Sequence, residues 1–154
     1  MKLKSSEDVD APIEQVFRLL SDIDNLERLA ARRGVDVIRA SEGPIREGSS
    51  WKVNFRLRGK DRSVDMELQK LQPSNFISVN ADGGGVSGVF AVELVALTPT
   101  CTRVRVSLDM AASSIPGRLL LQSLKLARSK VQQRFRDRMG KFAAVLEERL
   151  ADYA

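Results

Sequence analysis

The 154-residue sequence contains no histidine and only one cysteine, Cys101. Without histidine the chain cannot form a Ser-His-Asp triad or a Cys-His pair, and it lacks the commonest metal ligand. A single cysteine cannot form an internal disulfide, which suits a reducing compartment. We therefore expect no metal ion and no cofactor, and the sequence suggests no catalytic residue.

Long apolar runs are also missing. No stretch approaches the ~18 apolar residues that a membrane-spanning helix needs, and the first ten residues, MKLKSSEDVD, lack the apolar segment of a signal peptide. Gly and Pro number only 10 and 5, and hydrophobic residues make up 43% of the chain, as in ordinary folded proteins. These features predict one cytoplasmic domain over residues 1–154, with no membrane span.

The net charge of +5 is unevenly distributed. Residues 1–112 hold 16 basic and 16 acidic residues, whereas residues 113–154 hold 9 basic and 4 acidic residues. A basic helix in the second segment could contact anionic lipid or nucleic acid. A hydrated helix face is the more common explanation, so we expect no nucleic-acid partner. Peripheral contact with a membrane stays open as an alternative.

Two short helices are predicted near the N-terminus. Pro12 suits a first helical position, and Ile13, Val16, Phe17 and Leu20 recur at helical spacing, which predicts a helix over residues 12–20. A second helix is expected over residues 22–33, with Gly34 ending it.

From about residue 35 to residue 110 the apolar period is two. Trp51, Val53, Phe55 and Leu57 alternate with polar residues, and residues 63–69 and 103–110 repeat the pattern. Such alternation is typical of antiparallel strands with one dry face. Turn residues between the runs predict about six strands, and the N-terminal stretch adds a seventh. DGGGVSG, residues 82–88, lacks the Lys-Ser/Thr pair of a phosphate-binding loop, so we interpret it as a hairpin turn.

After Ser114 the period becomes helical again. An apolar stripe predicts one helix from about 116 to about 150, with Gly140 as a candidate bend; the stripe consists of Leu120, Leu124, Ala127, Val131, Phe135, Phe142, Val145 or Leu146, and Leu150. The dry face of the sheet is the only large partner for such a stripe. The expected fold is therefore α+β of the helix-grip type, in which a curved antiparallel sheet wraps a long C-terminal helix and the two short helices close one end.

Three segments resemble the SRPBCC superfamily, which includes START-type, birch-pollen-allergen-like and bacterial polyketide cyclase/dehydrase-like proteins. The pattern V-x-A-P-x-E-Q-V-F-x-L-L-S-D at residues 9–22 resembles its N-terminus, and residues 42–60 and 97–110 resemble later strands. Cys101 stands where glycine is usual, so we expect a wider or strained turn there. The resemblance implies a small apolar ligand, such as a lipid, in a cavity between sheet and helix.

The candidate ligand-binding residues are the apolar positions expected to face that interior. For each alone, core packing is the simpler explanation, but a sheet that grips a helix often leaves unfilled volume. They are Trp51, Val53, Phe55, Met66, Phe90, Leu120, Leu124 and Val131. Arg134 and Arg138 lie beside the helical stripe, where they could reach a ligand carboxylate or extend to solvent.

Three functions fit these patterns. The first is non-enzymatic binding or carriage of a small apolar or amphipathic molecule. The second is a cyclase or dehydratase-like enzyme, which would need an acid or base in the cavity that the inward positions do not clearly supply. The third is a protein- or membrane-surface module that uses the basic C-terminal helix. The first is the hypothesis that we favour.

Overall fold

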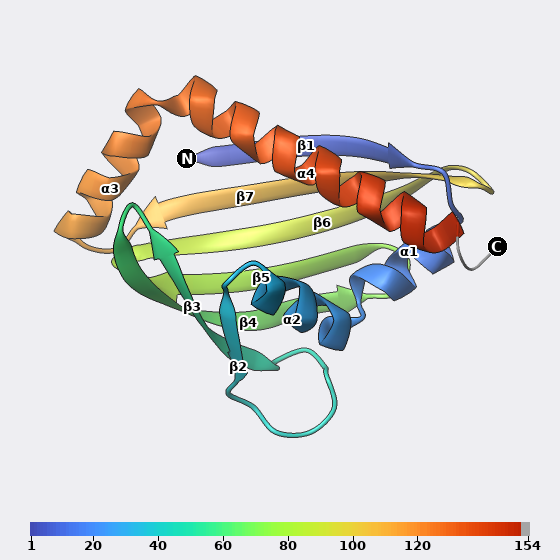
Figure 1. The fold of residues 1–154 in the computed structure, drawn as a ribbon, viewed down its shortest axis with the longest axis horizontal. Coiled ribbons are helices and arrows are strands. Elements are labelled where there is room, and N and C mark those ends of the chain that lie inside the picture. The colour runs from blue at the N-terminus through green and yellow to red at the C-terminus, as the bar shows by residue number, and fades with distance from the viewer. Residues whose placement is uncertain (152–154) are drawn as a thin grey trace.

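The computed structural model describes residues 1–151, and the last three residues of the expected domain lie outside this range. Within residues 1–151 the order is one strand, two short helices, six consecutive strands and two further helices, as shown in Figure 1. The elements are β1 (Lys2–Val9), α1 (Ile13–Leu20), α2 (Ile23–Arg32), β2 (Asp36–Arg39), β3 (Ser50–Leu57), β4 (Lys60–Gln72), β5 (Phe76–Gly83), β6 (Val86–Thr98), β7 (Cys101–Ala112), α3 (Ile115–Leu126) and α4 (Arg128–Ala151).

The strands form one antiparallel sheet in the order β1-β7-β6-β5-β4-β3-β2. The predicted alternation appears in the register: Trp51 pairs with Met66 and Val53 with Val64, so the apolar positions of β3 and β4 share one face. We call the face that carries the helices the inner face and the opposite one the outer face (Figure 1). The structure confirms the seven strands, the two short helices and the long C-terminal helix of the predicted helix-grip fold.

The main core lies at one end of the inner face. Val16 of α1, Val104 of β7 and Leu146 of α4 are among its buried members. Burial of such side chains is the main favourable term in folding. The short helix α1 therefore closes the end of the grip, where it packs against α4, β6 and β7.

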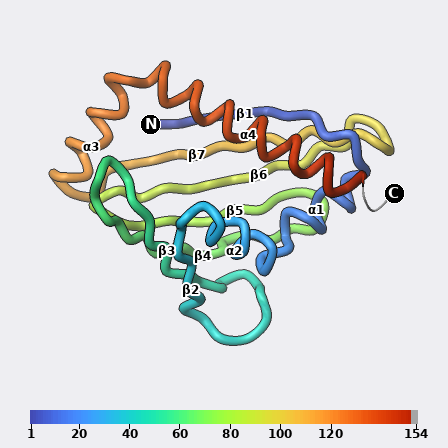
Figure 2. Tube along the Cα trace, viewed as in Figure 1, coloured from blue at the N-terminus to red at the C-terminus, as the bar shows by residue number. Residues whose placement is uncertain are grey.

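The prediction of one continuous helix over residues 116–150 is wrong. The helical path breaks at Ala127, whose φ of −106° and ψ of 27° lie outside the α-helical region. Figure 2 shows α3 and α4 running in clearly different directions from this point. Gly140, the candidate bend, lies inside α4 without interrupting it.

Contacts on either side of the break explain it. Arg58, in the β3–β4 turn, donates to Ser123 Oγ of α3 at 2.9 Å. On α4, the side-chain amide of Gln132 donates to the Lys4 carbonyl at 2.6 Å and accepts from the Lys4 N–H at 3.3 Å. These bonds satisfy two backbone groups on the open edge of strand β1. α3 is thus held to one end of the sheet and α4 to its β1 edge, and the direction changes between them.

The turn before β7 is tight. Thr98 pairs with Cys101, so only two residues lie between the strands, and Cys101 has no positive φ. The turn is thus neither wider nor strained at Cys101 itself, but the strand register shifts between Ala96 and Thr98, so an irregularity lies in β6 directly before the turn. The glycine-rich turn between β5 and β6 is a hairpin, as predicted, and Gly84 and Gly85 have φ values of 62° and 78°, which glycine adopts at little cost.

Candidate functional site

The structure places the eight candidate ligand-binding residues on the inner face or on the helices beside it. Five belong to strands and share inner-face register positions, and three belong to helices. The strand residues are Trp51, Val53, Phe55, Met66 and Phe90; the helix residues are Leu120 and Leu124 of α3 and Val131 of α4.

These residues lie outside the most deeply buried part of the protein. Trp51 is buried, with 7% of its surface exposed, whereas the other seven are only half-buried. By contrast Val16 and Leu146, at the other end of the inner face, are 0% and 4% exposed. The inner face therefore has a closely packed end beneath α1 and a less completely covered apolar end beside α3.

Small residues occupy the middle of the less covered end. Across the sheet, Met66 pairs with Ala81, Ala81 with Gly88, and Gly88 with Met110. A β-carbon added at Gly88 would have its nearest neighbour, a Leu108 methyl carbon, at 3.6 Å, which is an ordinary van der Waals distance. The chain thus places two small residues, Ala81 and Gly88, between two methionines, and at Gly88 a methyl group would fit without displacing its neighbours.

Trp51 has a buried polar atom without a partner. Its indole Nε1 is excluded from solvent and forms no hydrogen bond with any of the residues in 1–151. Leaving a buried donor unsatisfied costs about 1–3 kcal/mol, so such atoms call for a specific explanation. The indole N–H can donate one hydrogen bond to an acceptor that enters from outside the chain.

The basic group beside Trp51 in the sheet is already paired. Arg39 stands opposite Trp51 in β2, and its guanidinium donates to Glu27 of α2 at 2.7 and 3.0 Å and also to Asp24. The hydrogen bond with Glu27 is the main cause that raises the pKa of Arg39, partial burial opposes it, and Asp24 adds to the rise. Arg39 therefore fastens α2 to the sheet edge.

Arg134 and Arg138 are both exposed on α4. Of the two alternatives for these side chains, the structure shows the one in which they extend to solvent.

Glycine contacts fix the start of α3 above this end of the sheet. A β-carbon on Gly85 would overlap the Ser114 hydroxyl, and the Ser113 N–H donates to the Gly85 carbonyl at 2.7 Å. The Ser114 hydroxyl also accepts from the Gly117 N–H at 3.1 Å and caps the helix. The glycines of DGGGVSG therefore allow the hairpin and helix α3 to approach at backbone distance.

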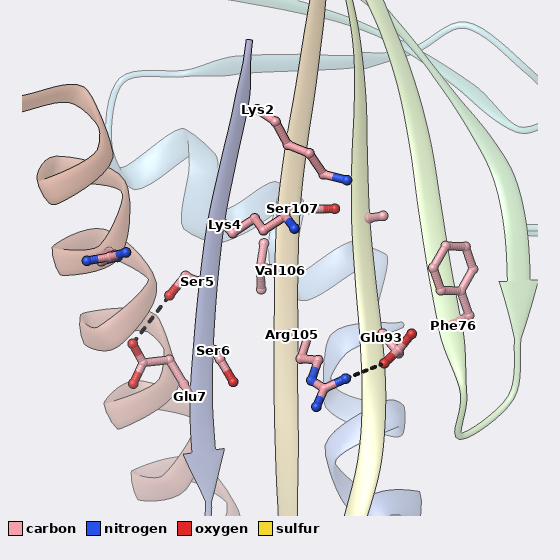
Figure 3. A pocket seen from close by; sticks show the side chains of 12 residues that line it. Lys2, Lys4, Ser5, Ser6, Glu7, Phe76, Glu93, Arg105, Val106 and Ser107 are labelled. Carbon is pink, nitrogen blue, oxygen red and sulfur yellow. Dashed lines mark hydrogen bonds and ion pairs between the residues drawn. The ribbon is translucent and has the colours of Figure 1, made fainter. Parts of the chain in front are cut away.

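A polar hollow of about 620 Å³ lies across β1, β7, β6 and β5, with most of its lining on the outer face. Figure 3 shows Lys2, Lys4, Arg105 and Glu93 around it. Arg105 pairs with Glu93 at 3.4 Å, and the charged side chains are mostly exposed. None of the eight candidate residues lines this hollow. Sequence reasoning missed it because most of its residues are polar members of alternating strands, which resemble an ordinary hydrated face.

Residues 1–151 contain no group of three or more His, Cys, Asp or Glu side chains placed to hold a metal ion. Within the same range no helix is both long and apolar enough to cross a membrane. Cys101 lies at the start of β7, outside the inner-face set. Burial raises the pKa of its thiol, and the nearby Asp10 and Asp8 raise it further.

Comparison with protein families gives a clear match. Residues 1–147 match the family described as polyketide cyclase/dehydrase and lipid transport. The chain belongs to this family. The match confirms the resemblance to SRPBCC proteins and covers almost all of the described residues. Comparison with curated protein sequences gives no match.

Several solved structures have the same fold and match most of the length of this chain. TTHA0849 from Thermus thermophilus is 18% identical, with a TM-score of 0.70, and the match covers 100% of this chain and 99% of that one. Norcoclaurine synthase from Thalictrum flavum is 10% identical, with a TM-score of 0.70 and coverage of 100% and 88%. The Zhui aromatase/cyclase from a Streptomyces species is 15% identical, with a TM-score of 0.63 and coverage of 86% and 88%. At these identities the likeness establishes the fold.

Proposed function

We propose that this protein binds a small apolar or amphipathic molecule without changing it chemically, between the inner face of the sheet and helices α3 and α4. The unpaired, buried N–H of Trp51 carries the proposal. A ligand oxygen in contact with this N–H would remove the cost of leaving it unsatisfied. Pockets that hold small molecules are mostly apolar with a few placed polar groups, and this arrangement has that character.

The ligand chemistry follows from the side chains. Met66, Phe90, Leu120 and Leu124 offer half-buried apolar surface, which favours an apolar body such as an acyl chain, a fused-ring polyketide or a sterol. Trp51 offers a donor only, so the molecule should carry a carbonyl, hydroxyl or carboxylate oxygen as acceptor. The proposed contacts include no positively charged side chain, so the ligand does not need to be an anion.

Binding is favoured over catalysis by the residue types of the eight proposed contacts. The eight proposed contacts include no acid or base, and the guanidinium of Arg39 is engaged by α2. General acid–base chemistry requires a titratable group within hydrogen-bond reach of the reacting atoms. The aromatase/cyclase and norcoclaurine synthase in the comparison are enzymes by their names, so turnover must be measured in the same experiment.

The test begins with mass spectrometry of the molecules that co-purify with the native protein, followed by titration of Trp51 fluorescence with fatty acids, aromatic polyketides and sterols. Trp51 is the only tryptophan, so its signal reports the inner face directly. We expect a saturable change with one class and recovery of that molecule unaltered. Recovery of a converted product would replace the binding proposal with the enzymatic one.

A matched pair of variants locates the ligand. Ala81→Leu adds volume on the inner face of β5, and Ala91→Leu adds the same volume on the outer face of β6, where Ala91 lines the polar hollow. We expect Ala81→Leu to weaken binding at least tenfold and Ala91→Leu to leave it unchanged. The reverse result would place the ligand in the outer hollow and refute the proposed site.

A further inference from the structure

Helix α3 exposes a row of large apolar side chains. Its buried side includes Leu121, but Ile115, Leu119 and Leu126 on its other side are 73%, 62% and 91% exposed. Their separations of four and seven residues place all three on one side of the helix. Isolated exposed apolar residues are common, whereas a row of three on one helix face indicates an interaction surface.

Positive charge surrounds this row. Residues 113–130 contain four basic and no acidic residues, and residues 56–62 of the β3–β4 hairpin contain four basic and one acidic residue. The basic residues are Arg118, Lys125, Arg128 and Lys130 in the first segment and Arg56, Arg58, Lys60 and Arg62 in the second. Together the two segments carry a net charge of +7, although the whole chain carries only +5.

The two segments lie side by side at one end of the molecule. Arg58 of the hairpin donates to Ser123 of α3 at 2.9 Å, and Figure 1 shows both segments at the end opposite to the β6–β7 turn. We call residues 56–62 and 113–130 the basic end. The hairpin adds Leu57, which is 42% exposed, to the apolar side chains there.

We propose that the basic end docks on an anionic membrane surface, with Leu119 and Leu126 inserted among the lipid headgroups and the surrounding cations near lipid phosphates. Interfacial helices combine an apolar side with basic residues in this way. A second copy of the chain would bring two ends of the same charge together. A nucleic acid would match the charge but would leave the three apolar side chains in water.

Docking does not require the inner face to hold a ligand. If the inner face does hold one, docking would allow the ligand to enter the site from the membrane. Leu120 and Leu124 of that site belong to α3, the helix that would lie on the lipid. A molecule leaving the membrane would then meet the less completely covered end of the inner face first. Vesicle binding by the purified protein tests docking without any added ligand.

The experiment is co-sedimentation with vesicles of phosphatidylcholine alone and of phosphatidylcholine containing phosphatidylglycerol. We expect binding to the anionic vesicles at least tenfold stronger than to the neutral ones. Raising the ionic strength from about 0.1 M to about 1 M shortens the Debye length from about 10 Å to about 3 Å and should weaken binding strongly. Equal binding to both vesicle types, or no binding to either, would overturn the proposal.

Paired variants separate apolar insertion from simple charge attraction. Leu119→Ser with Leu126→Ser should weaken binding to anionic vesicles on the order of tenfold or more, since each insertion removes apolar surface from water. Lys125→Gln and Lys130→Gln should each weaken binding to anionic vesicles about fivefold. The controls are Leu97→Ser, an exposed leucine near the β6–β7 turn, and Lys141→Gln, an exposed lysine of α4.

Both controls should leave binding unchanged. If Leu97→Ser weakens binding as much as the double leucine variant does, the basic end is not the docking surface. If the leucine substitutions have no effect while the lysine substitutions do, the surface attracts polyanions without inserting into lipid, and the proposal is wrong.

Discussion

Gly117 in α3 lies against Gly85 in the β5–β6 turn so closely that a β-carbon on Gly117 would overlap the Gly85 carbonyl oxygen. The same carbonyl accepts the Ser113 N–H at 2.7 Å. Two glycines separated by 31 intervening residues thus set the position of α3. Because α3 forms one side of the proposed ligand site, this contact also positions that side.

Substituting Gly117 should therefore be costly. Gly117→Ala forces backbone atoms apart, and such overpacking typically destabilises by about 1–3 kcal/mol. The matched control is Gly88→Ala, where the added carbon would meet its nearest atom at 3.6 Å and the change should stay below about 1 kcal/mol. Urea denaturation measures both free energies of unfolding. Equal losses would mean that α3 does not pack on the turn as described.

Truncations along the C-terminal helices should have unequal effects. Leu146 of α4 is 4% exposed, so Leu146→Ala should cost about 2–5 kcal/mol. The sequence predicts the same loss for Leu124, but this residue is only half-buried, so Leu124→Ala should cost about 1–2 kcal/mol. Arg136 is exposed, and Arg136→Ala should change stability by less than about 0.5 kcal/mol.

The same urea experiments test the expectation of one domain. A single domain of this size should unfold in one cooperative transition. Two transitions, with Leu146→Ala shifting only one of them, would show that the end of the molecule containing α3 unfolds separately from the main core.

The strands and the inner-face positions could be predicted because their signal is local. Alternation along β3 is enough to place Trp51, Val53 and Phe55 on one face, and the register agrees. The break at Ala127 depends instead on contacts between distant segments: Arg58 with Ser123, and Gln132 with Lys4, which are 65 and 128 residues apart. Helical periodicity contains no information about these contacts.

The apolar side of α3 was also hard to predict. Positions 119, 120 and 121 are all leucine, so several helix faces are apolar, and the predicted stripe included Leu120 but not Leu121. Leu121 is the buried one of the three, and Leu119 is mostly exposed. A helix that is apolar on two sides can pack on the sheet with one and interact with a partner through the other.

The pairing of Asp8 with Arg103 predicts a pH-dependent contribution to stability. Arg103 donates to the two carboxylate oxygens of Asp8 at 2.9 and 3.2 Å, and these bonds lower the pKa of Asp8 despite partial burial. Since the folded pKa lies below the unfolded one, the contribution is present at neutral pH and is lost as the pH falls through the folded pKa.

Asp8→Asn should therefore be less stable than the parent protein at pH 7, and the difference should shrink in acid. Glu42→Gln is the control, because Glu42 is exposed and forms no ion pair with the described residues. Thermal melts from neutral to acidic pH measure the difference. A difference for Asp8→Asn that is independent of pH would contradict the ion-pair explanation.

Cys101 should react slowly with alkylating reagents at neutral pH. Burial raises the pKa of its thiol, Asp10 and Asp8 add to the effect, and Arg103 opposes it. The thiolate is the reactive form. The reaction rate should therefore rise only when the pH exceeds the pKa of a free cysteine. Asp10→Asn should move the rate profile to lower pH. A rate at pH 7 equal to that of a small-molecule thiol would show that Cys101 is not shielded in this way.

Trp51→Phe tests the atom on which the proposed function depends. The substitution removes the unpaired indole N–H and keeps much of the apolar volume. Removal of an unsatisfied buried donor offsets part of the lost packing, so stability should change by less than about 1.5 kcal/mol. A hydrogen bond contributes about 0.5–1.5 kcal/mol, so affinity for an oxygen-bearing ligand should fall by about two- to tenfold. Calorimetry replaces fluorescence, since the variant has no tryptophan.

An analogue of the same ligand without the oxygen should bind the parent protein and Trp51→Phe equally well. If both molecules lose affinity to the same extent, Trp51 acts only through its apolar surface and donates no hydrogen bond to the ligand.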